Sequence, residues 1–288
     1  MFKGTGTALI TPFEESFEVD YQALKKLIRF QLEGGINSLV VLGTTGEAAT
    51  IDDEERRKIV ETVIVEVDRQ VPVIIGTGTN DTKKVVENNK IAEDFKADGL
   101  LIVNPYYNKG TQAGLVEHYR YIAERTNLPI LIYNVPSRTS MNLLPETVLK
   151  IHEVCPNVIG VKEASGDISQ IARLMAMKPE DFLVFSGNDD QTIPIMALGG
   201  NGVISVFSNV FPGVMVSITD AIFKGDWALA REINAKYLKI MNDLFIETNP
   251  IPVKFALSLL GYCKNVLRLP LTKATEKTSD ILMKSISR

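Results

Sequence analysis

Lys162 ends an apolar run, residues 158–161, that has the composition of a buried strand. Removal from water disfavours the ammonium ion, so a lysine in such a place has a lowered pKa and can attack a carbonyl carbon as a free amine. The side chain could instead reach solvent or pair with Glu163 or Asp167. Its position in the sequence allows both interpretations.

Tyr133 ends a second apolar run, residues 130–132, and Arg138 follows in the next loop. A phenol can transfer protons when hydrogen bonds connect it to a relay, but an aromatic ring at this place can also serve only to fill the mouth of a barrel. The planar guanidinium of Arg138 suits bidentate binding of a carboxylate, whereas many loop arginines are ordinary surface residues. The sequence therefore places a candidate acid or base near a candidate anion ligand.

Two further loops carry hydroxyl groups after apolar runs. Residues 43–47, GTTGE, combine backbone N–H groups with two threonine hydroxyls that could hold a carboxylate or a phosphate, although such turns are common in loops. Tyr106 and Tyr107 follow residues 104–105. A pair of tyrosines in a loop suggests either stacking at an interface or a second phenol for the site.

Eight short runs rich in valine, isoleucine and leucine must position these groups, and a longer segment with helical spacing follows each run. The runs are Gly6 to Ile10, Ser38 to Leu42, Val73 to Gly76, Gly99 to Val103, Ile130 to Tyr133, Val158 to Lys162, Leu183 to Ser186, and Gly202 to Val206. Eight consecutive βα units predict a closed (β/α)8 TIM barrel, in which active sites lie at the carboxyl ends of the strands.

The strand pattern stops after Phe211. We therefore expect residues 1–211 to form the barrel and residues 212–288 to form a helical appendage packed on it. The first three predicted helices each follow an aspartate, at positions 20, 52 and 81, that can cap the first turn. Helices are predicted over residues 21–33, 53–68, 82–94, 228–245 and 252–262.

The composition excludes several classes of function. The 288 residues include 35 acidic and 31 basic side chains, a net charge of -4, without the dense basic stripe that nucleic acids require. Cys155 and Cys263 stand far apart and only two histidines are present, so neither a disulfide nor a metal site is predicted. The glycines at 76 and 78 lack the third glycine of the dinucleotide fingerprint, so no nicotinamide or flavin cofactor is expected.

The sequence also predicts a cytoplasmic protein without membrane contact. No apolar stretch approaches the roughly 20 residues that span a bilayer. The first residues lack the basic, apolar and small-residue regions of a signal peptide.

Five motifs occur together in this chain: GTTGE at 43–47, NPYYN at 104–108, YNVPSRT at 133–139, GVKEASGD at 160–167 and NPIPVK at 249–254. In their order and spacing they closely resemble the 4-hydroxy-tetrahydrodipicolinate synthase (dihydrodipicolinate synthase) family, within the pyruvate-dependent class I aldolase superfamily. The resemblance extends from about Phe2 to the region of Leu271.

The resemblance implies that pyruvate and L-aspartate 4-semialdehyde condense to 4-hydroxy-tetrahydrodipicolinate, the first committed step of the diaminopimelate route to lysine. Lys162 would form a Schiff base with pyruvate, and the enamine form would add to the aldehyde. Tyr133, Thr44 and Tyr107 would form a proton relay, with Tyr107 supplied by the neighbouring subunit. A protonated imine is itself an electron sink, so neither a metal nor a cofactor is implied.

The same resemblance assigns the binding residues and the assembly. Thr45 and the backbone of Thr44 would hold the pyruvate carboxylate, and Arg138 would hold the carboxylate of the semialdehyde. Gly187 and Ile204 would line the imine site. The family is usually a homotetramer built as a dimer of dimers, so a tetramer or a dimer is implied.

Three other functions fit parts of this pattern. N-acetylneuraminate lyase and the 2-keto-3-deoxy sugar-acid aldolases share the lysine, the tyrosine and a GTTGE-like loop, but a polyol chain would not need Arg138. A catalytically silent keto-acid binder would need a carboxylate clamp without the nucleophile Lys162. A phosphate-binding barrel enzyme would also leave Lys162 unexplained.

Three positions bear on regulation by L-lysine. In lysine-inhibited members of the family, the effector binds near the positions that Asp53, Arg56 and Lys84 occupy in this sequence. Histidines are usual at the first two positions, and a glutamate that faces the ammonium group of the effector is usual at the third. The resemblance therefore implies that feedback inhibition by lysine is absent or weak.

Overall fold

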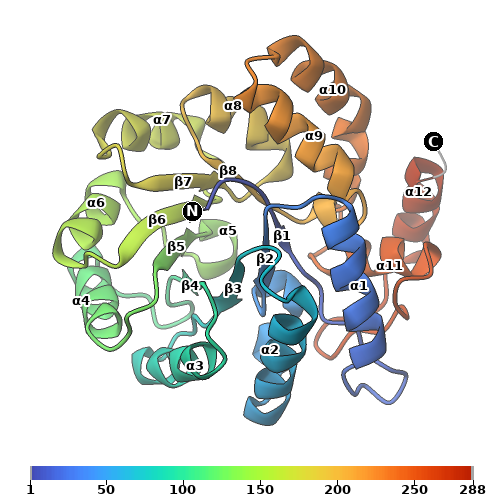
Figure 1. Cartoon of the computed structure of the whole chain (residues 1–288), viewed down its shortest axis with the longest axis horizontal. Coiled ribbons are helices and arrows are strands. Elements are labelled where there is room, and N and C mark those ends of the chain that lie inside the picture. The colour runs from blue at the N-terminus through green and yellow to red at the C-terminus, as the bar shows by residue number, and fades with distance from the viewer. Residues whose placement is uncertain (1, 287–288) are drawn as a thin grey trace. The chain divides into compact units, whose positions relative to one another are not determined.

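The computed structural model describes residues 2–286, and within them eight parallel strands form a closed barrel. Each strand neighbours the next one in sequence (Figure 1). The strands are β1 Gly4–Ala8, β2 Ser38–Val41, β3 Val73–Gly76, β4 Gly99–Val103, β5 Ile130–Asn134, β6 Val158–Glu163, β7 Leu183–Ser186 and β8 Gly202–Ser205. The predicted (β/α)8 TIM barrel with C-terminal helices is confirmed.

Most of the strands form where branched apolar side chains are buried on both faces, as in other parallel sheets. Every residue of β5 is buried, for example. β3, β4 and β7 have the predicted bounds, and four other strands end one residue away from them. The prediction for β1, Gly6 to Ile10, is wrong by two residues. The strand begins earlier because Thr5 and Thr7 are buried in it, with hydroxyls bonded to Thr219 and Ser208.

At least one helix follows each strand. The helices are α1 Tyr21–Glu33, α2 Asp53–Val67, α3 Thr82–Asp94, α4 Gln112–Ala123, α5 Pro136–Thr139, α6 Pro145–Val154, α7 Ile168–Met177, α8 Thr192–Ala197, α9 Pro212–Phe223, α10 Trp227–Asp243, α11 Ile251–Leu259 and α12 Glu276–Ile286. The five segments that the sequence predicts as helices are helical, and their ends differ from the prediction by no more than three residues.

Capping aspartates set where the first three long helices begin. Asp20, Asp52 and Asp81 each accept a hydrogen bond from a backbone N–H group of the first turn, as predicted. Asp52 and Glu55 form a reciprocal capping box, which satisfies two backbone donors at the start of α2. α2 ends at Val67 rather than at the predicted position 68, where the backbone turns into the left-handed region.

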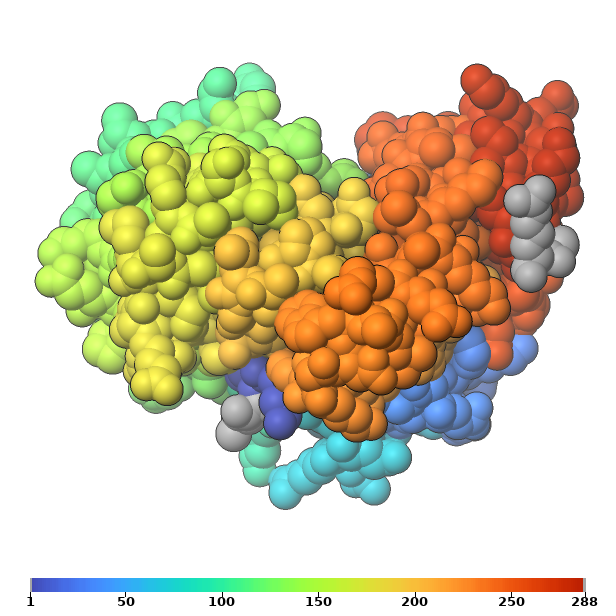
Figure 2. Space-filling view, turned by 90° about the horizontal axis from the view of Figure 1, so that it is seen from above, coloured from blue at the N-terminus to red at the C-terminus, as the bar shows by residue number. Residues whose placement is uncertain are grey.

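The chain divides into two compact units. Unit 1 comprises the residues up to Val73 and those from Ser205 onward, and unit 2 comprises Ile74–Ile204. In unit 1, α9 packs on β1, and α10 packs against α9 and α12. Helices α9 and α10 form the orange surface of Figure 2. The predicted boundary between residues 211 and 212 stays a proposal. No helix among residues 2–286 is long and apolar enough to cross a membrane.

Candidate active site

Lys162 lies near the end of β6 in unit 2 and is only 5% exposed. Burial lowers the pKa of its ammonium group to about 8, while the charge of Asp189 opposes this shift and that of Arg138 adds to it. About a tenth of the lysine is therefore an uncharged amine at neutral pH. The uncharged amine is the form of lysine that can attack a carbonyl carbon.

Tyr133 lies beside Lys162, because the two residues are register partners in the pairing of β5 with β6. The Lys162 Nζ lies 4.3 Å from the centre of the Tyr133 ring. An aromatic face attracts an ammonium group but, unlike a carboxylate, does not form an ion pair with it. The neighbouring strands thus bring a candidate nucleophile and a phenol together.

The two carboxylates nearest to Lys162 in the sequence, those of Glu163 and Asp167, are hydrogen-bonded elsewhere. Glu163 accepts hydrogen bonds from the Asn134 side chain at 3.1 and 3.2 Å and from the Ser165 N–H at 2.7 Å. Asp167 caps α7 by accepting a hydrogen bond from the backbone of its first turn. These contacts argue against an ion pair of Lys162 with Glu163 or Asp167, the pairing that the sequence left open.

A buried polar network lies behind the two strand ends. Side chains alternate along a strand, so Asn134 and Glu163 face away from Tyr133 and Lys162, which precede them. Asn134 donates to Glu163 and accepts a hydrogen bond from Asn104 at 3.1 Å. Burial raises the pKa of Glu163, and these hydrogen bonds oppose the shift. Sequence reasoning missed this network because only the strand pairing shows that its members meet.

Gly187 and Arg138 relate to Lys162 in different ways. A Cβ atom at Gly187 would lie 2.6 Å from the Ala164 Cβ and 3.2 Å from the Lys162 Cε, so a side chain there would overlap with Ala164 and crowd the lysine. Arg138 is exposed in the short helix α5, and its charge helps to lower the pKa of Lys162. Ile204 is buried in β8.

The GTTGE segment forms a tight turn in unit 1. Residues Thr44–Gly46 make a single 3-10 turn, η1. Thr45 is buried, and its hydroxyl oxygen accepts a hydrogen bond from the Asn249 side chain at 2.9 Å. Thr44 is half-buried. Because Asn249 begins the NPIPVK motif, two motifs far apart in sequence meet at this turn.

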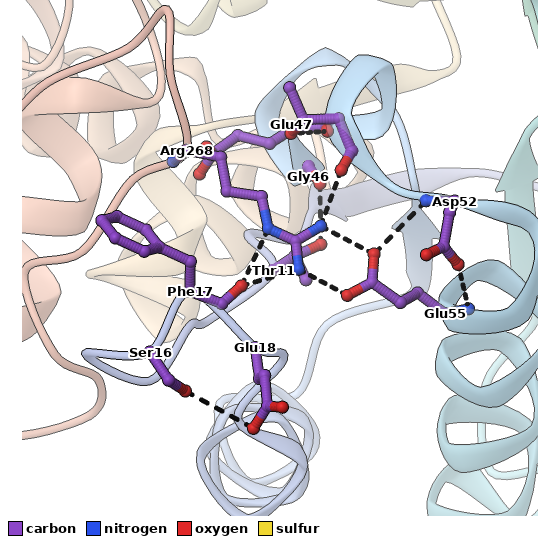
Figure 3. Close-up of polar contacts among 10 residues, drawn as sticks. Thr11, Ser16, Phe17, Glu18, Gly46, Glu47, Asp52, Glu55 and Arg268 are labelled. Carbon is purple, nitrogen blue, oxygen red and sulfur yellow. Dashed lines mark hydrogen bonds and ion pairs between the residues drawn. The ribbon is translucent and has the colours of Figure 1, made fainter.

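Glu47 and Lys254 form a second contact between the same two motifs. The Lys254 Nζ lies 2.5 Å from the Glu47 Oε1, and both side chains are almost completely buried. Lys254 also donates to the Val266 carbonyl at 2.9 Å, and its Nζ lies 4.0 Å from the centre of the Phe13 ring. The Arg268 N–H donates to the other Glu47 oxygen at 3.1 Å (Figure 3). Sequence reasoning missed this pair, although the two motifs carry opposite charges.

Tyr107 is 91% exposed on the loop after β4, in unit 2. Its backbone is left-handed, with φ of 70°, and the side chain of the next residue, Asn108, donates to the Asn80 carbonyl at 2.9 Å. The phenol of Tyr107 is therefore accessible from solvent on a loop that Asn108 anchors.

The structure thus groups the predicted residues in two sets. Lys162, Tyr133 and Gly187 lie together in unit 2, where Arg138 acts on the lysine through its charge. Thr44 and Thr45 lie together in the η1 turn of unit 1. Over residues 2–286, no group of three or more His, Cys, Asp or Glu side chains is placed to hold a metal ion.

Comparison with protein families matches residues 1–288 to the dihydrodipicolinate synthetase family. The chain belongs to this family. It is 53% identical over 285 residues to the 4-hydroxy-tetrahydrodipicolinate synthase of Thermotoga neapolitana, an alignment that covers 98% of this chain and 97% of the relative.

Two solved structures share the fold over the whole chain. The dihydrodipicolinate synthase of Thermotoga maritima superposes with a TM-score of 0.98 at 49% identity, covering 100% of this chain and 98% of the other. The chloride-inhibited enzyme of Acinetobacter baumannii, complexed with pyruvate, superposes with a TM-score of 0.97 at 38% identity, again covering 100% and 98%. The predicted family and the predicted enzyme class, a lyase of lysine biosynthesis, are confirmed.

Proposed function

We propose that this chain makes 4-hydroxy-tetrahydrodipicolinate from pyruvate and L-aspartate 4-semialdehyde through an imine on Lys162. Membership of the family supports the net reaction, and a solved relative binds pyruvate. The observation that carries the proposed site is the buried amine of Lys162, which has a pKa of about 8 and lies beside Tyr133.

The reaction begins when the uncharged Lys162 amine attacks the ketone carbon of pyruvate, and loss of water leaves a protonated imine. Loss of a proton from the pyruvate methyl group gives an enamine, which forms a carbon–carbon bond to the aldehyde carbon of the second substrate. The aldehyde oxygen takes up a proton and becomes a hydroxyl group. The substrate amino group then attacks the imine carbon and releases Lys162, so the net reaction yields one water.

The remaining roles follow from the family resemblance. Tyr133 transfers protons during imine formation and cyclisation, and Thr44 and Tyr107 belong to the same relay. Its place beside Lys162 supports this role for Tyr133. Thr45 and the backbone of Thr44 hold the pyruvate carboxylate.

Three further residues complete the proposed site. Arg138 holds the carboxylate of the semialdehyde through its two-pronged guanidinium group. Gly187 and Ile204 line the imine site. The close approach of Gly187 to the Lys162 side chain supports its part in this assignment.

Reduction with borohydride in the presence of pyruvate, followed by peptide mass analysis, tests the nucleophile. We expect a reduced three-carbon adduct on the peptide that contains Lys162. Lys254 is the internal control, because it is a second buried lysine in the same chain. An adduct on Lys254, or an unmodified Lys162, would reject the proposal, and reduction without pyruvate supplies the blank.

We also propose that the chain assembles as a dimer, or as a tetramer of two dimers, in which Tyr107 serves the site of a second copy. Its 91% exposure supports a role outside its own chain. Mixing inactive Tyr107→Phe with inactive Lys162→Ala should restore partial activity, because one site of a hybrid dimer then contains both residues. No recovery after verified subunit exchange would mean that Tyr107 acts within its own chain or is not needed.

A further inference from the structure

The backbone at Glu47 has a conformation that its residue type rarely adopts. Its φ of 53° lies in the left-handed region, which glycine enters readily and other residues seldom do. Glu47 directly follows η1, which contains Thr44 and Thr45, and its N–H donates to the Thr44 carbonyl at 3.1 Å. The conformation of Glu47 therefore determines how the η1 turn closes.

The side chain of Glu47 is held at both carboxylate oxygens. Oε1 lies 2.5 Å from the Lys254 Nζ, and Oε2 accepts a hydrogen bond from the Arg268 N–H at 3.1 Å. The guanidinium of Arg268 is in turn fixed by the carboxylate of Glu55 and the carbonyl oxygen of Phe17 (Figure 3). It also donates to the carbonyl oxygen of Thr50. A buried carboxylate with two fixed partners can keep its backbone in an unfavoured conformation.

The neighbouring residues of the turn have anchors of their own. The Thr11 hydroxyl donates to the Gly46 carbonyl at 2.7 Å, and the Thr50 hydroxyl donates to the Glu47 carbonyl at 3.1 Å. Asn249 holds Thr45 from the same segment that supplies Lys254. These three hydrogen bonds do not involve the charges of Glu47 and Lys254, so they can persist when the ion pair is replaced.

We propose that Glu47 and Lys254 are positioning residues that set the Thr44–Thr45 turn for the carboxylate of the keto acid. This inference rests on the proposed role of Thr44 and Thr45 in binding pyruvate. A carboxylate site made of N–H groups and hydroxyls depends on their orientation before the ligand arrives, because groups that are already in place avoid the cost of being ordered on binding. Neither Glu47 nor Lys254 needs to touch the substrate for this effect.

The test removes both charges together, in Glu47→Gln/Lys254→Met. Removing only one would leave an uncompensated buried charge, which destabilises the fold strongly, whereas removing both avoids this cost. Trapping of pyruvate by borohydride is then measured against pyruvate concentration, together with the rate at saturating pyruvate. Lys239→Met/Asp243→Asn is the matched control, because it also removes both charges of an ion pair, and this pair lies on α10, apart from the turn, with the Lys239 Nζ 2.6 Å from the Asp243 Oδ2.

The double variant should need about tenfold more pyruvate for half-maximal trapping, while the adduct at saturation still forms on Lys162 and the saturated rate changes much less. The control should match the wild type. A folded double variant with an unchanged half-saturating concentration would overturn the inference, as would a uniform loss of rate without a change in pyruvate dependence.

A milder variant covers the case in which the double variant does not fold. Glu47→Asp keeps the charge but shortens the side chain by one methylene, so its carboxylate no longer reaches both partners in the same geometry. The half-saturating pyruvate concentration should rise in this variant too, and an unchanged value overturns the inference. If the wild type itself forms no adduct on Lys162, the proposed function fails, and this outcome is distinct from a failure of the positioning role.

Discussion

Lys162 in unit 2 and Lys254 in unit 1 are both buried, yet their surroundings differ. Burial is the main cause of a lowered pKa at each of them. Lys254 lies against the carboxylate of Glu47 and a backbone carbonyl, which hold its proton and occupy its donors. Lys162 lies over the ring of Tyr133. The comparison shows that burial alone does not make a lysine a nucleophile, because the direct partner decides whether its lone pair becomes available.

Replacement of the reactive lysine should have the largest effect. Lys162→Arg should lower kcat by at least about a thousandfold, because a guanidinium stays protonated and cannot form an imine. Steady-state kinetics on the folded variant measures the loss. If the variant retained a tenth or more of the wild-type rate, the assignment of the two lysines would have to be exchanged or abandoned.

The loss of Arg138 should affect the second substrate and spare the first. Arg138→Ala leaves the carboxylate of the semialdehyde without its bidentate partner. Breaking a buried charge pair costs about 2 to 5 kcal/mol, and because Arg138 is exposed we expect the lower end, a fall of about thirtyfold in kcat/KM for the semialdehyde. Trapping of pyruvate on Lys162 should survive. Wild-type kinetics with the semialdehyde would show that Arg138 is an ordinary surface arginine.

The pH dependence of imine formation tests the lowered pKa of Lys162. Because the reactive form of Lys162 is the uncharged amine, the rate should rise with pH and level off above a midpoint near 8. Arg138→Ala removes a positive charge that lowers this pKa, so the midpoint should move upward. The rate of pyruvate imine formation across the transition measures both. A midpoint near the ordinary lysine value in the wild type would contradict the conclusion that burial dominates the pKa of Lys162.

The smallest expected effect is that of L-lysine on the rate. It depends on the charges of Asp53, Arg56 and Lys84. The Lys84 Nζ lies 3.3 Å from the Glu87 Oε2. The charge of Asp53 acts on the buried guanidinium of Arg56. A like charge in place of an attractive carboxylate changes a contact worth about 1 to 4 kcal/mol at 4 Å. Millimolar L-lysine should therefore leave the rate unchanged and give no saturable heat in calorimetry.

The matched variant for this prediction is Lys84→Glu, which restores the negative charge usual in lysine-inhibited relatives. A gain of inhibition in this variant alone would support the electrostatic explanation. A clear binding isotherm with the wild-type chain would refute it.

Local patterns predict most of this fold, and side-chain hydrogen bonds explain where they fail. β3 and β4 are continuous runs of apolar residues and glycine that are bounded by proline or polar residues, so their bounds can be read directly. β1 begins with Gly4 and contains Thr5 and Thr7. Threonine is polar in a hydropathy pattern, and only the positions of Thr219 and Ser208 in the folded chain show why it can be buried there.

In the candidate site, too, one contact can be predicted from a local rule and another cannot. The rule that side chains at the ends of neighbouring parallel strands meet is sufficient to bring Lys162 close to Tyr133. No local rule connects Glu47 to Lys254, because their contact depends on how a distant helix packs. A charge of each sign inside two otherwise uncharged motifs is the one signal that could have suggested the pair.

The η1 turn and the residues that anchor it lie far apart in the sequence, so they are synthesised at different times. Asn249 follows Thr45 by 204 positions, and Arg268 follows Glu47 by 221. A ribosome adds about 5 to 20 residues per second, so the residues of the turn are synthesised roughly ten to forty seconds before their partners. During that interval a nascent chain already carries its threonines but cannot yet hold them in place. Competence to bind the keto acid should therefore appear only near the end of translation.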